Sequence, residues 1–290
     1  MTSTPRVLAI ANQKGGVGKT TTTINLATGL AQAEQRVLLV DLDPQGNATM
    51  GSGIDKRSLT HGAYAVLLGL STIESSRQRA THATYDVVGA NRDLAGAEIE
   101  LVNLPHRERR LKEALALVAD QYDFVLLDCP PALNLLTVNA LVGADAVIIP
   151  MQCEYYALEG LSDLVNTIKM VRNRLNPKLE IDGLLRTLFD PRNSLAQQVA
   201  AELDQHFGDK VYASIIPRNV RLAEAPSHGM PGLIYDPTSR GAQAYAAFAQ
   251  EVLARSHAAH AHAEASTAAS TTPSKPTDEA PPPDTQENPR

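Results

Sequence analysis

The most constraining feature of this chain is a run rich in glycine and lysine at residues 12–23, Asn-Gln-Lys-Gly-Gly-Val-Gly-Lys-Thr-Thr-Thr-Thr. It follows an apolar segment typical of a buried strand, Val7–Ala11, and it precedes a helical pattern, Ile24–Leu30. Glycines in such a turn let backbone N–H groups point at phosphate oxygens, while a lysine adds a cation and a threonine adds a hydroxyl for Mg²⁺. The run therefore predicts a phosphate-binding loop, formed by Gly15, Gly16, Val17, Gly18, Lys19, Thr20 and Thr21.

The loop departs from the general pattern G-x-x-x-x-G-K-[ST] at its first glycine. Gln13 occupies that position, and a second lysine, Lys14, precedes the glycines, so the run satisfies K-G-G-x-G-K-[ST] instead. The alternative is a glycine-rich turn whose lysines only face solvent, and it explains neither the strand before the loop nor the helix after it. We therefore predict a nucleoside triphosphatase with an unusual phosphate loop.

Apolar strand candidates recur along the chain, and each is followed by a helical pattern. Alternation of buried strands and amphipathic helices is typical of a mostly parallel sheet that is covered on both faces. The predicted fold class is therefore α/β, with a doubly wound sheet and helices on both faces. The strand candidates are Val7–Ala11, Val37–Leu42, Phe124–Leu127, Ala146–Pro150 and Ile181–Leu188.

A long stretch between the second and third strand candidates resembles an insertion. It carries its own pattern of short elements, and a last helix closes the body of the chain at Arg240–Arg255. The elements expected inside the insertion are helices near Tyr64–Leu68, Ala95–Val102 and Glu108–Ala119, and a strand near Tyr85–Val88.

The composition changes after residue 255. Ser256–Arg290 contains no valine, isoleucine, leucine, methionine or aromatic residue, and it holds six prolines. Such a segment cannot bury enough apolar area to offset its ordering entropy. We therefore expect one ATPase domain at residues 1–255 and a disordered tail at 256–290. The alternative of a metal site at His257, His260 and His262 lacks supporting carboxylates.

Charge and cysteine content narrow the cellular setting. The formal net charge is −6, of which the tail contributes −3 (two basic minus five acidic residues), and the remaining −3 leaves room for a local basic patch. Cys129 and Cys153 lie far apart in sequence in apolar surroundings, which is typical of buried thiols in a reducing compartment. No secretory signal opens the chain and no apolar run approaches about 18 residues, so we expect a cytoplasmic protein without a membrane span.

Two acids follow the second strand candidate, in the run Asp41-Leu42-Asp43-Pro44-Gln45-Gly46-Asn47. Ligands of doubly wound sheets bind at the carboxyl ends of the strands. Attack on a γ-phosphate needs an oriented water, which a carboxylate on a rigid strand end can position. We assign that role to Asp43, with a tentative water-mediated contact to Mg²⁺, and we expect Asp41 to support the loop or the water shell of the metal. The alternative reading is a pair of helix N-caps.

A third carboxylate ends the apolar strand Phe124–Leu127, at Asp128. This arrangement is the Walker B pattern, and Mg²⁺ keeps most of its waters in such sites. We therefore expect Thr20 to ligate the ion directly and Asp128 to hold it through a water. No glutamate follows Asp128, which leaves Asp43 as the predicted catalytic acid.

Taken together, these residues resemble the chromosomal ParA (Soj-type) family of DNA-segregation ATPases, within the ParA/MinD superfamily with a deviant Walker A loop. The resemblance spans about residues 6–255, and its last two segments separate this family from its relatives better than the phosphate loop does. The segments are Lys14–Thr20, Asp41–Thr49, Asp128–Pro131, Gln152–Gly160 and Ile216–Ser227.

The resemblance implies an ATP- and Mg²⁺-dependent sandwich dimer that binds double-stranded DNA without sequence preference on the nucleoid. Slow hydrolysis would be stimulated by a ParB-type partner. It also implies that Lys14 acts catalytically by reaching across the dimer to the partner's nucleotide, and that Pro217 and Asn219 face the adenine. The implied DNA contacts are Arg218 and Arg221, with Arg192 as a tentative third; the plainer alternative is that these are solvated surface charges.

Three rival classes share parts of this pattern. A membrane-associated MinD-like ATPase needs a basic amphipathic helix with large apolar residues at its C-terminus, and this tail has none. An iron–sulfur carrier needs cysteines that converge, and the two cysteines here are unpaired. A small-molecule ligase or kinase with the same loop remains an alternative, which metabolite-dependent turnover of nucleotide would identify.

Overall fold

The computed structural model describes residues 4–155 and 157–270. Their strands form one sheet in the order β3-β4-β2-β5-β1-β6-β7-β8. All neighbouring strands are parallel except β3 and β4, which pair antiparallel at one edge. The strands are β1 (Arg6–Ile10), β2 (Val37–Asp41), β3 (Arg77–Arg79), β4 (Asp86–Val88), β5 (Phe124–Asp128), β6 (Ala146–Gln152), β7 (Glu180–Phe189) and β8 (Val211–Pro217).

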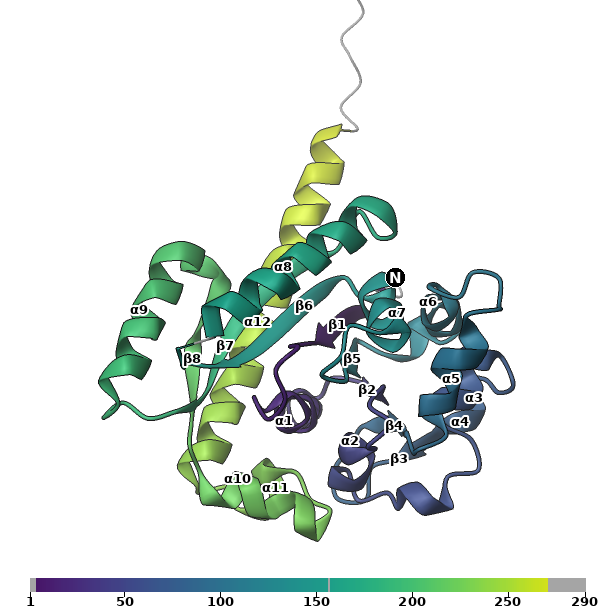
Figure 1. The fold of residues 1–290 in the computed structure, drawn as a ribbon, viewed down its shortest axis with the longest axis horizontal. Coiled ribbons are helices and arrows are strands. Elements are labelled where there is room, and N and C mark those ends of the chain that lie inside the picture. Colours follow the sequence, from purple (N-terminus) through teal and green to yellow (C-terminus); the bar gives the residue numbers. More distant parts are fainter. Residues whose placement is uncertain (1–3, 156, 271–290) are drawn as a thin grey trace, which may run out of the picture. The chain divides into compact units, whose positions relative to one another are not determined.

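Helices lie on both faces of this sheet, which confirms the predicted doubly wound α/β fold (Figure 1). The long helices connect successive parallel strands, as crossovers must. The α-helices are α1 (Lys19–Gln32), α2 (Asn47–Gly51), α3 (Ala63–Leu68), α4 (Ile73–Ser76), α5 (Leu94–Leu101), α6 (Arg110–Ala116), α7 (Leu135–Gly143), α8 (Ala157–Arg174), α9 (Ser194–Phe207), α10 (Val220–Glu224), α11 (Gly232–Tyr235) and α12 (Arg240–Ser270).

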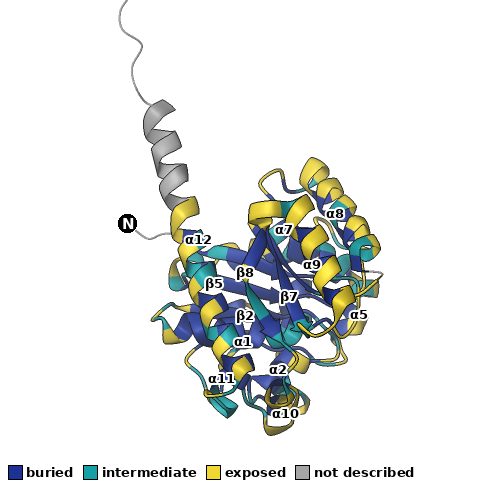
Figure 2. Ribbon diagram, turned by 90° about the vertical axis from the view of Figure 1, so that its left-hand side faces the viewer, coloured by how far each residue is buried: buried dark blue, intermediate teal, exposed yellow. Residues whose placement is uncertain are grey.

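Two apolar clusters, one on each face, hold the layers together. Side chains alternate along β1: Val7 and Ala9 join the cluster under α3 and α5–α9, while Leu8 and Ile10 join the cluster under α1, α11 and α12. This alternation follows from the two-residue period of a strand, and burial on both faces requires apolar residues at nearly every position. Figure 2 shows the consequence, a buried sheet beneath helices whose outer faces are exposed.

One close helix contact depends on a glycine. A Cβ added at Gly29 of α1 would lie 2.5 Å from the Cβ of Ala249 in α12. The two helices therefore approach closely only because Gly29 has no side chain. Tyr245 of α12 adds a buried hydrogen bond to Thr22 of α1, with 3.0 Å between the two hydroxyl oxygens. These contacts hold the helix that follows the phosphate loop.

The sequence located the central strands well and missed two edge strands. β1, β2, β5, β6 and β7 lie within one or two residues of their predicted bounds. β3 and β8 were not predicted, because β3 has only three residues and β8 carries exposed or half-exposed positions that weaken its apolar pattern. The insertion contributes β3 and β4 to the sheet rather than forming a separate lobe.

Contacts divide the chain into a unit of residues 1–253 and a unit that begins at residue 254. We predicted that the last helix ends at Arg255, whereas α12 continues to Ser270. The physical reason is its composition: alanine, the best helix former, fills most positions after His257. The predicted disorder after residue 270 lies outside the described residues.

Candidate functional site: a phosphate loop, buried acids and an apolar cavity

The phosphate loop connects β1 to α1 at the carboxyl edge of the sheet. Gly16 and Gly18 have φ of 74° and 85°, a conformation that side chains rarely adopt, so glycine is required at both positions. The Thr187 hydroxyl at the end of β7 donates to the Val17 carbonyl at 2.8 Å and ties the loop to the sheet. The Val17 side chain is itself buried, which anchors the middle of the loop in the core. The loop is therefore held in a bent conformation by its glycines and by its contact with β7.

Lys19 is fixed inside this loop. Only 7% of the residue is exposed, and its ammonium donates to the Lys14 carbonyl at 3.0 Å. Burial lowers the pKa of Lys19, and the nearby carboxylates of Asp128 and Asp43 oppose that shift. The ammonium group is thus a positioned charge rather than a mobile one.

Two buried carboxylates lie side by side next to the loop. Asp41 ends β2 and Asp128 ends β5, and the two residues are paired in the register of these strands. Asp128 accepts from the hydroxyls of Thr20 at 2.8 Å and Thr23 at 2.9 Å. Burial, followed by repulsion from Asp41, raises the pKa of Asp128; burial also raises that of Asp41. A divalent cation next to Thr20 and Asp128 would relieve this unfavourable accumulation of negative charge, so the residues present fit Mg²⁺.

Asp41 supports the loop that carries Asp43. Its carboxylate accepts from the Asp43 amide at 3.1 Å, and from the Thr49 amide and hydroxyl at 2.8 and 2.7 Å. Asp43 is half-buried and faces the cavity, and it accepts from the Gln45 amide at 2.9 Å. The structure therefore separates the two acids: the first holds the turn, and the second is available to a ligand.

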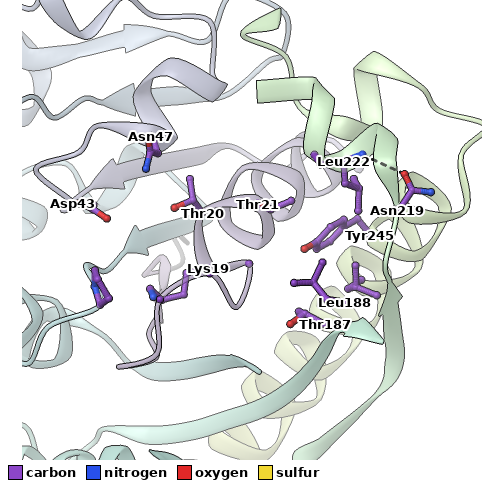
Figure 3. Close-up of a pocket in the computed structure, with 16 residues that line it drawn as sticks. Lys19, Thr20, Thr21, Asp43, Asn47, Thr187, Leu188, Asn219, Leu222 and Tyr245 are labelled. Atoms are coloured by element: carbon purple, nitrogen blue, oxygen red, sulfur yellow. Dashed lines mark hydrogen bonds between the residues drawn. The ribbon is translucent and has the colours of Figure 1, made fainter. Parts of the chain in front are cut away.

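A cavity of about 360 Å³ lies against the loop. Figure 3 shows Lys19, Thr20, Asp43 and Asn47 at one end, and Leu188, Leu222, Asn219 and Tyr245 at the other. One end is therefore polar and cationic, and the other is largely apolar. This combination suits a ligand with a charged phosphate part and a flat aromatic part.

Several lining residues escaped the sequence analysis. Asn47 begins α2, and the apolar end is formed by side chains from four separate elements, β7, β8, α10 and α12. Leu188 has φ of 49°, an uncommon conformation for a branched side chain, and this backbone feature leaves no signature in sequence. The lining residues that were not predicted are Asn47, Pro131, Thr187, Leu188, Ile216, Leu222, Ala223 and Tyr245.

The two residues expected at the adenine occupy different places. Asn219 lines the cavity, and its side chain accepts from the Leu222 amide at 3.2 Å and caps α10. Pro217 is not among the lining residues; its neighbour Ile216 takes that position. Side chains alternate along β8, and this alternation points residue 216 inward.

Lys14 points away from the phosphate cavity of its own chain. Its ammonium forms an ion pair with Glu154, just after β6, and both side chains are about half-exposed. Lys14 is absent from the cavity wall, whereas its carbonyl anchors Lys19. The backbone of Lys14 therefore belongs to the loop, and its side chain faces outward.

The three arginines expected to contact DNA lie on two adjacent segments. The Arg218 amide donates to the Phe189 carbonyl at 3.2 Å, which brings the end of β8 next to the end of β7 and the turn that carries Arg192. Arg192 is paired with Asp190, and Arg221 is paired with Glu224 and Asp236. The structure thus brings Arg218 next to the turn that carries Asp190 and Arg192, with Arg221 three residues further along the chain, and two of the three already have carboxylate partners.

The comparisons with known proteins agree with this geometry. A family model described as an AAA domain (AAA_31) matches residues 5–181. The chain is 53% identical over 249 residues to the sporulation initiation inhibitor protein Soj of Bacillus subtilis, covering 86% of this chain and 98% of the relative. It is also 53% identical over 252 residues to the chromosome partitioning protein ParA of Caulobacter vibrioides, covering 86% of this chain and 94% of the relative.

A solved structure extends the comparison to bound ligands. The cobyrinic acid a,c-diamide synthase of Mycobacterium smegmatis with bound ATP analog and magnesium is 39% identical, with a TM-score of 0.76, and the match covers 86% of this chain and 94% of that chain.

In residues 4–155 and 157–270, no helix is both long enough and apolar enough to span a membrane.

The sheet order and the glycine-rich loop define a P-loop nucleotide-binding fold of the type found in MinD-like ATPases. Given the family match and these identities, the chain belongs to the AAA-domain family and, within it, to the ParA/Soj group of chromosome-partitioning ATPases.

Proposed function

We propose that this chain is an ATPase that partitions DNA by switching between an ATP-bound dimer on DNA and a released protomer. The single observation that carries the proposal is the joint placement of the bent lysine-containing loop, the buried acid pair and the apolar cavity at one edge of the sheet. The names of the relatives, chromosome partitioning proteins at 53% identity, supply the biological context.

The nucleotide would bind with its phosphates on the loop and its base at the apolar end of the cavity. The backbone of residues 15–21 and the Lys19 ammonium would hold the phosphates, and Leu188, Ile216 and Asn219 would surround the base. Thr20 and Asp128 would hold Mg²⁺, which neutralises charge on the phosphate oxygens when it is bound. ATP and magnesium in the solved relative support this assignment.

Hydrolysis requires a water oriented toward the γ-phosphate. Asp43 is the carboxylate that faces the cavity, while Asp41 is fully engaged in holding the turn. We assign to Asp43 the hydrogen bond that orients the water. Since no other carboxylate lines the cavity among the described residues, loss of Asp43 should leave binding intact and stop turnover.

The dimer would form through the outer side of the phosphate loop. Lys14 faces outward there, and a Cβ added at Gly15 would meet no heavy atom within 4 Å in the protomer. We propose that a second copy occupies this space and that Lys14 reaches its nucleotide. Gly15→Val should therefore remain monomeric in ATP by sedimentation, with ATP binding measured on the same variant because Gly15 also lines the cavity. An ATP-dependent dimer of this variant would contradict the geometry. Gly16 is a poorer test, because its φ of 74° strains any side chain within the protomer itself.

The dimer would present the arginine surface, formed by Arg192, Arg218 and Arg221, once on each protomer, and it would bind duplex DNA without regard to sequence. A ParB-type partner would accelerate hydrolysis and thereby release the protein from DNA. The decisive experiment is a DNA gel shift and an ATPase assay in ATP and in ADP. Arg218→Glu/Arg221→Glu should abolish DNA binding and leave ATP affinity unchanged, because both side chains lie outside the cavity wall. Unchanged DNA binding would move the DNA surface elsewhere.

A second candidate rests on one specific observation. The 39% identical solved structure is titled a cobyrinic acid a,c-diamide synthase, so ATP-driven amide synthesis on a small molecule is the alternative. ATP turnover that responds to cobyrinic acid and ignores DNA would select this candidate. Turnover that responds to DNA and a ParB-type protein would select partitioning.

A further inference from the structure

The arginine surface carries its own acidic residues. Arg192, Arg218 and Arg221 stand beside Asp190, Glu224 and Asp236, so three positive charges face three negative ones. A surface with balanced charge attracts a polyanion weakly, because local charge governs non-specific binding to DNA. The acids are therefore part of any account of how this surface binds.

The Asp190–Arg192 contact is the most complete of these pairs. The guanidinium donates through Nε to Oδ1 at 3.0 Å and through Nη2 to Oδ2 at 2.9 Å, while the Arg192 amide donates to Oδ1 at 3.0 Å. This two-pronged geometry is the one that arginine uses on phosphate. Asp190 therefore occupies one of the two-donor edges through which Arg192 could bind a DNA phosphate.

Arg221 is held in a similar way by two carboxylates. Its Nη1 donates to Glu224 at 2.9 Å, and its Nε lies 3.5 Å from Asp236. Arg218, in contrast, is exposed and forms no ion pair within the described ranges 4–155 and 157–270. The three arginines are thus unequal: one is available at once, and two must exchange partners.

We propose that Asp190 and Glu224 limit the DNA affinity of this surface by holding Arg192 and Arg221 in ion pairs that a DNA phosphate must displace. The inference rests on the proposed DNA-binding function and concerns the regulation of its surface. Both pairs are solvent-exposed, with 89% of the Arg192 side chain accessible, so each is weak enough to exchange. When a DNA phosphate replaces the carboxylate on the arginine, the freed carboxylate attracts a cation from solution. This uptake offsets part of the cation release that accompanies DNA binding.

A change of pH within the neutral range does not break the Asp190–Arg192 ion pair. Hydrogen bonds from Arg192, with a smaller contribution from the charge of Arg218, lower the pKa of Asp190 to about 2. The carboxylate stays ionised throughout the neutral range, so protonation does not free Arg192, whereas a competing anion can. DNA is such an anion, and binding at this surface is then a competition between carboxylate and phosphate.

The test is the salt dependence of DNA binding by the full-length protein in ATP, using a duplex of random sequence. Asp190→Asn keeps an oxygen for the Arg192 amide and removes only the charge. We expect tighter binding and a log–log salt slope steeper by up to about 0.9 for each arginine, or up to about 1.8 for a dimer. Glu224→Gln should act in the same direction.

The chain provides a matched control at Asp55 and Arg57. Asp55 also accepts from the amide two residues later, at 3.0 Å, and pairs with that residue's exposed guanidinium at 3.5 Å. Asp55→Asn therefore changes net charge by the same amount outside the arginine surface, and we expect no change in slope. The double variant Asp190→Asn/Arg192→Gln should lack the tighter DNA binding and the steeper salt slope that we expect for Asp190→Asn.

The outcomes separate this inference from the function on which it rests. If the wild type binds DNA in ATP but Asp190→Asn has the same salt slope, or if Asp55→Asn steepens the slope as much, the inference that Asp190 and Glu224 limit DNA affinity is overturned. The proposed DNA-binding function then stands. If neither the wild type nor Asp190→Asn binds DNA, both proposals fall. DNA binding that appears only in Asp190→Asn would directly support the inference that Asp190 limits DNA affinity.

Discussion

Two cationic regions of this molecule are suited to phosphate, and they are built in opposite ways. In the phosphate loop, Lys19 is 7% exposed and is held by a backbone carbonyl, with the carboxylates of Asp128 and Asp43 nearby. On the arginine surface, 89% of the Arg192 side chain is exposed, and its partner is a neighbouring carboxylate. One cation is fixed by the fold, and the other can change partners.

The difference indicates what each region can recognise. A buried cation with fixed donors has already lost its water and its freedom, so it favours one ligand geometry and responds little to salt. An exposed arginine gains little from any single partner, and its binding falls as salt rises. The loop is therefore suited to a defined nucleotide, and the arginine surface to a polymer of phosphates without sequence preference.

Removal of the fixed cation should have the largest effect. Lys19→Ala deletes the buried ammonium, whose charged hydrogen bonds to phosphate are each worth about 1.5–3 kcal/mol, so ATP affinity should fall by at least about 100-fold. Isothermal titration with ATP and Mg²⁺ measures this. Lys56→Ala, a lysine outside the cavity, serves as the control. Near-wild-type affinity in Lys19→Ala would show that the loop does not bind phosphate.

The next largest effect should fall on turnover alone. Asp43→Asn keeps the oxygen that accepts from the Gln45 amide and removes the charge that orients the water. The rate of hydrolysis should drop by about 100-fold or more, while ATP affinity changes little. A single-turnover assay together with an ATP titration measures both. Normal hydrolysis would transfer the role to another group.

The arginine surface should show smaller, graded effects. Arg218→Ala should flatten the salt slope of DNA binding by about 1.8 in a dimer, one contact being lost from each protomer. Arg221→Ala should flatten it less, because the charge of Arg221 is partly used by Glu224 and Asp236. DNA affinity measured across a series of salt concentrations compares the two. Equal flattening would contradict the inequality among the arginines.

The smallest effect should come from removing the hydrogen bond between Thr22 and Tyr245, which supports the helix after the phosphate loop. Tyr245→Phe removes the buried hydrogen bond to Thr22 and should lower the free energy of unfolding by about 1 kcal/mol. Thr22→Val alone should cost more than the pair Thr22→Val/Tyr245→Phe, because the single change leaves a buried hydroxyl without its partner. Urea denaturation of the three variants tests this, and full additivity would show that the two hydroxyls are not coupled.

Much of the phosphate end was predictable from sequence because local rules produce it. A buried strand, three glycines and a lysine within one turn specify a loop whose backbone faces inward. Asp41 and Asp128 follow apolar strands, and parallel strands bring their carboxyl ends to one edge. The fold class and the polar half of the cavity therefore follow from short-range patterns.

The apolar half of the cavity was not predictable in the same way. Leu188, Ile216, Leu222 and Tyr245 come from four separate elements, β7, β8, α10 and α12, and each would pass for an ordinary core residue. Pro217 was expected to face the adenine, whereas Ile216, its neighbour in the strand, lines the cavity. Nothing local indicates which apolar side chains line a cavity rather than fill a core.

The sequence by itself determined the charges on the arginine surface, and only the tertiary structure decided their partners. Arg192 and Asp190 are separated by one residue, yet a turn was needed to bring both guanidinium donors onto the carboxylate. Arg221 meets Asp236 only because α10 and the chain after α11 lie together. Covalent order sets which charges exist, whereas ion pairs and cavity walls depend on distances in space. Those distances follow from packing the whole sheet and its helices.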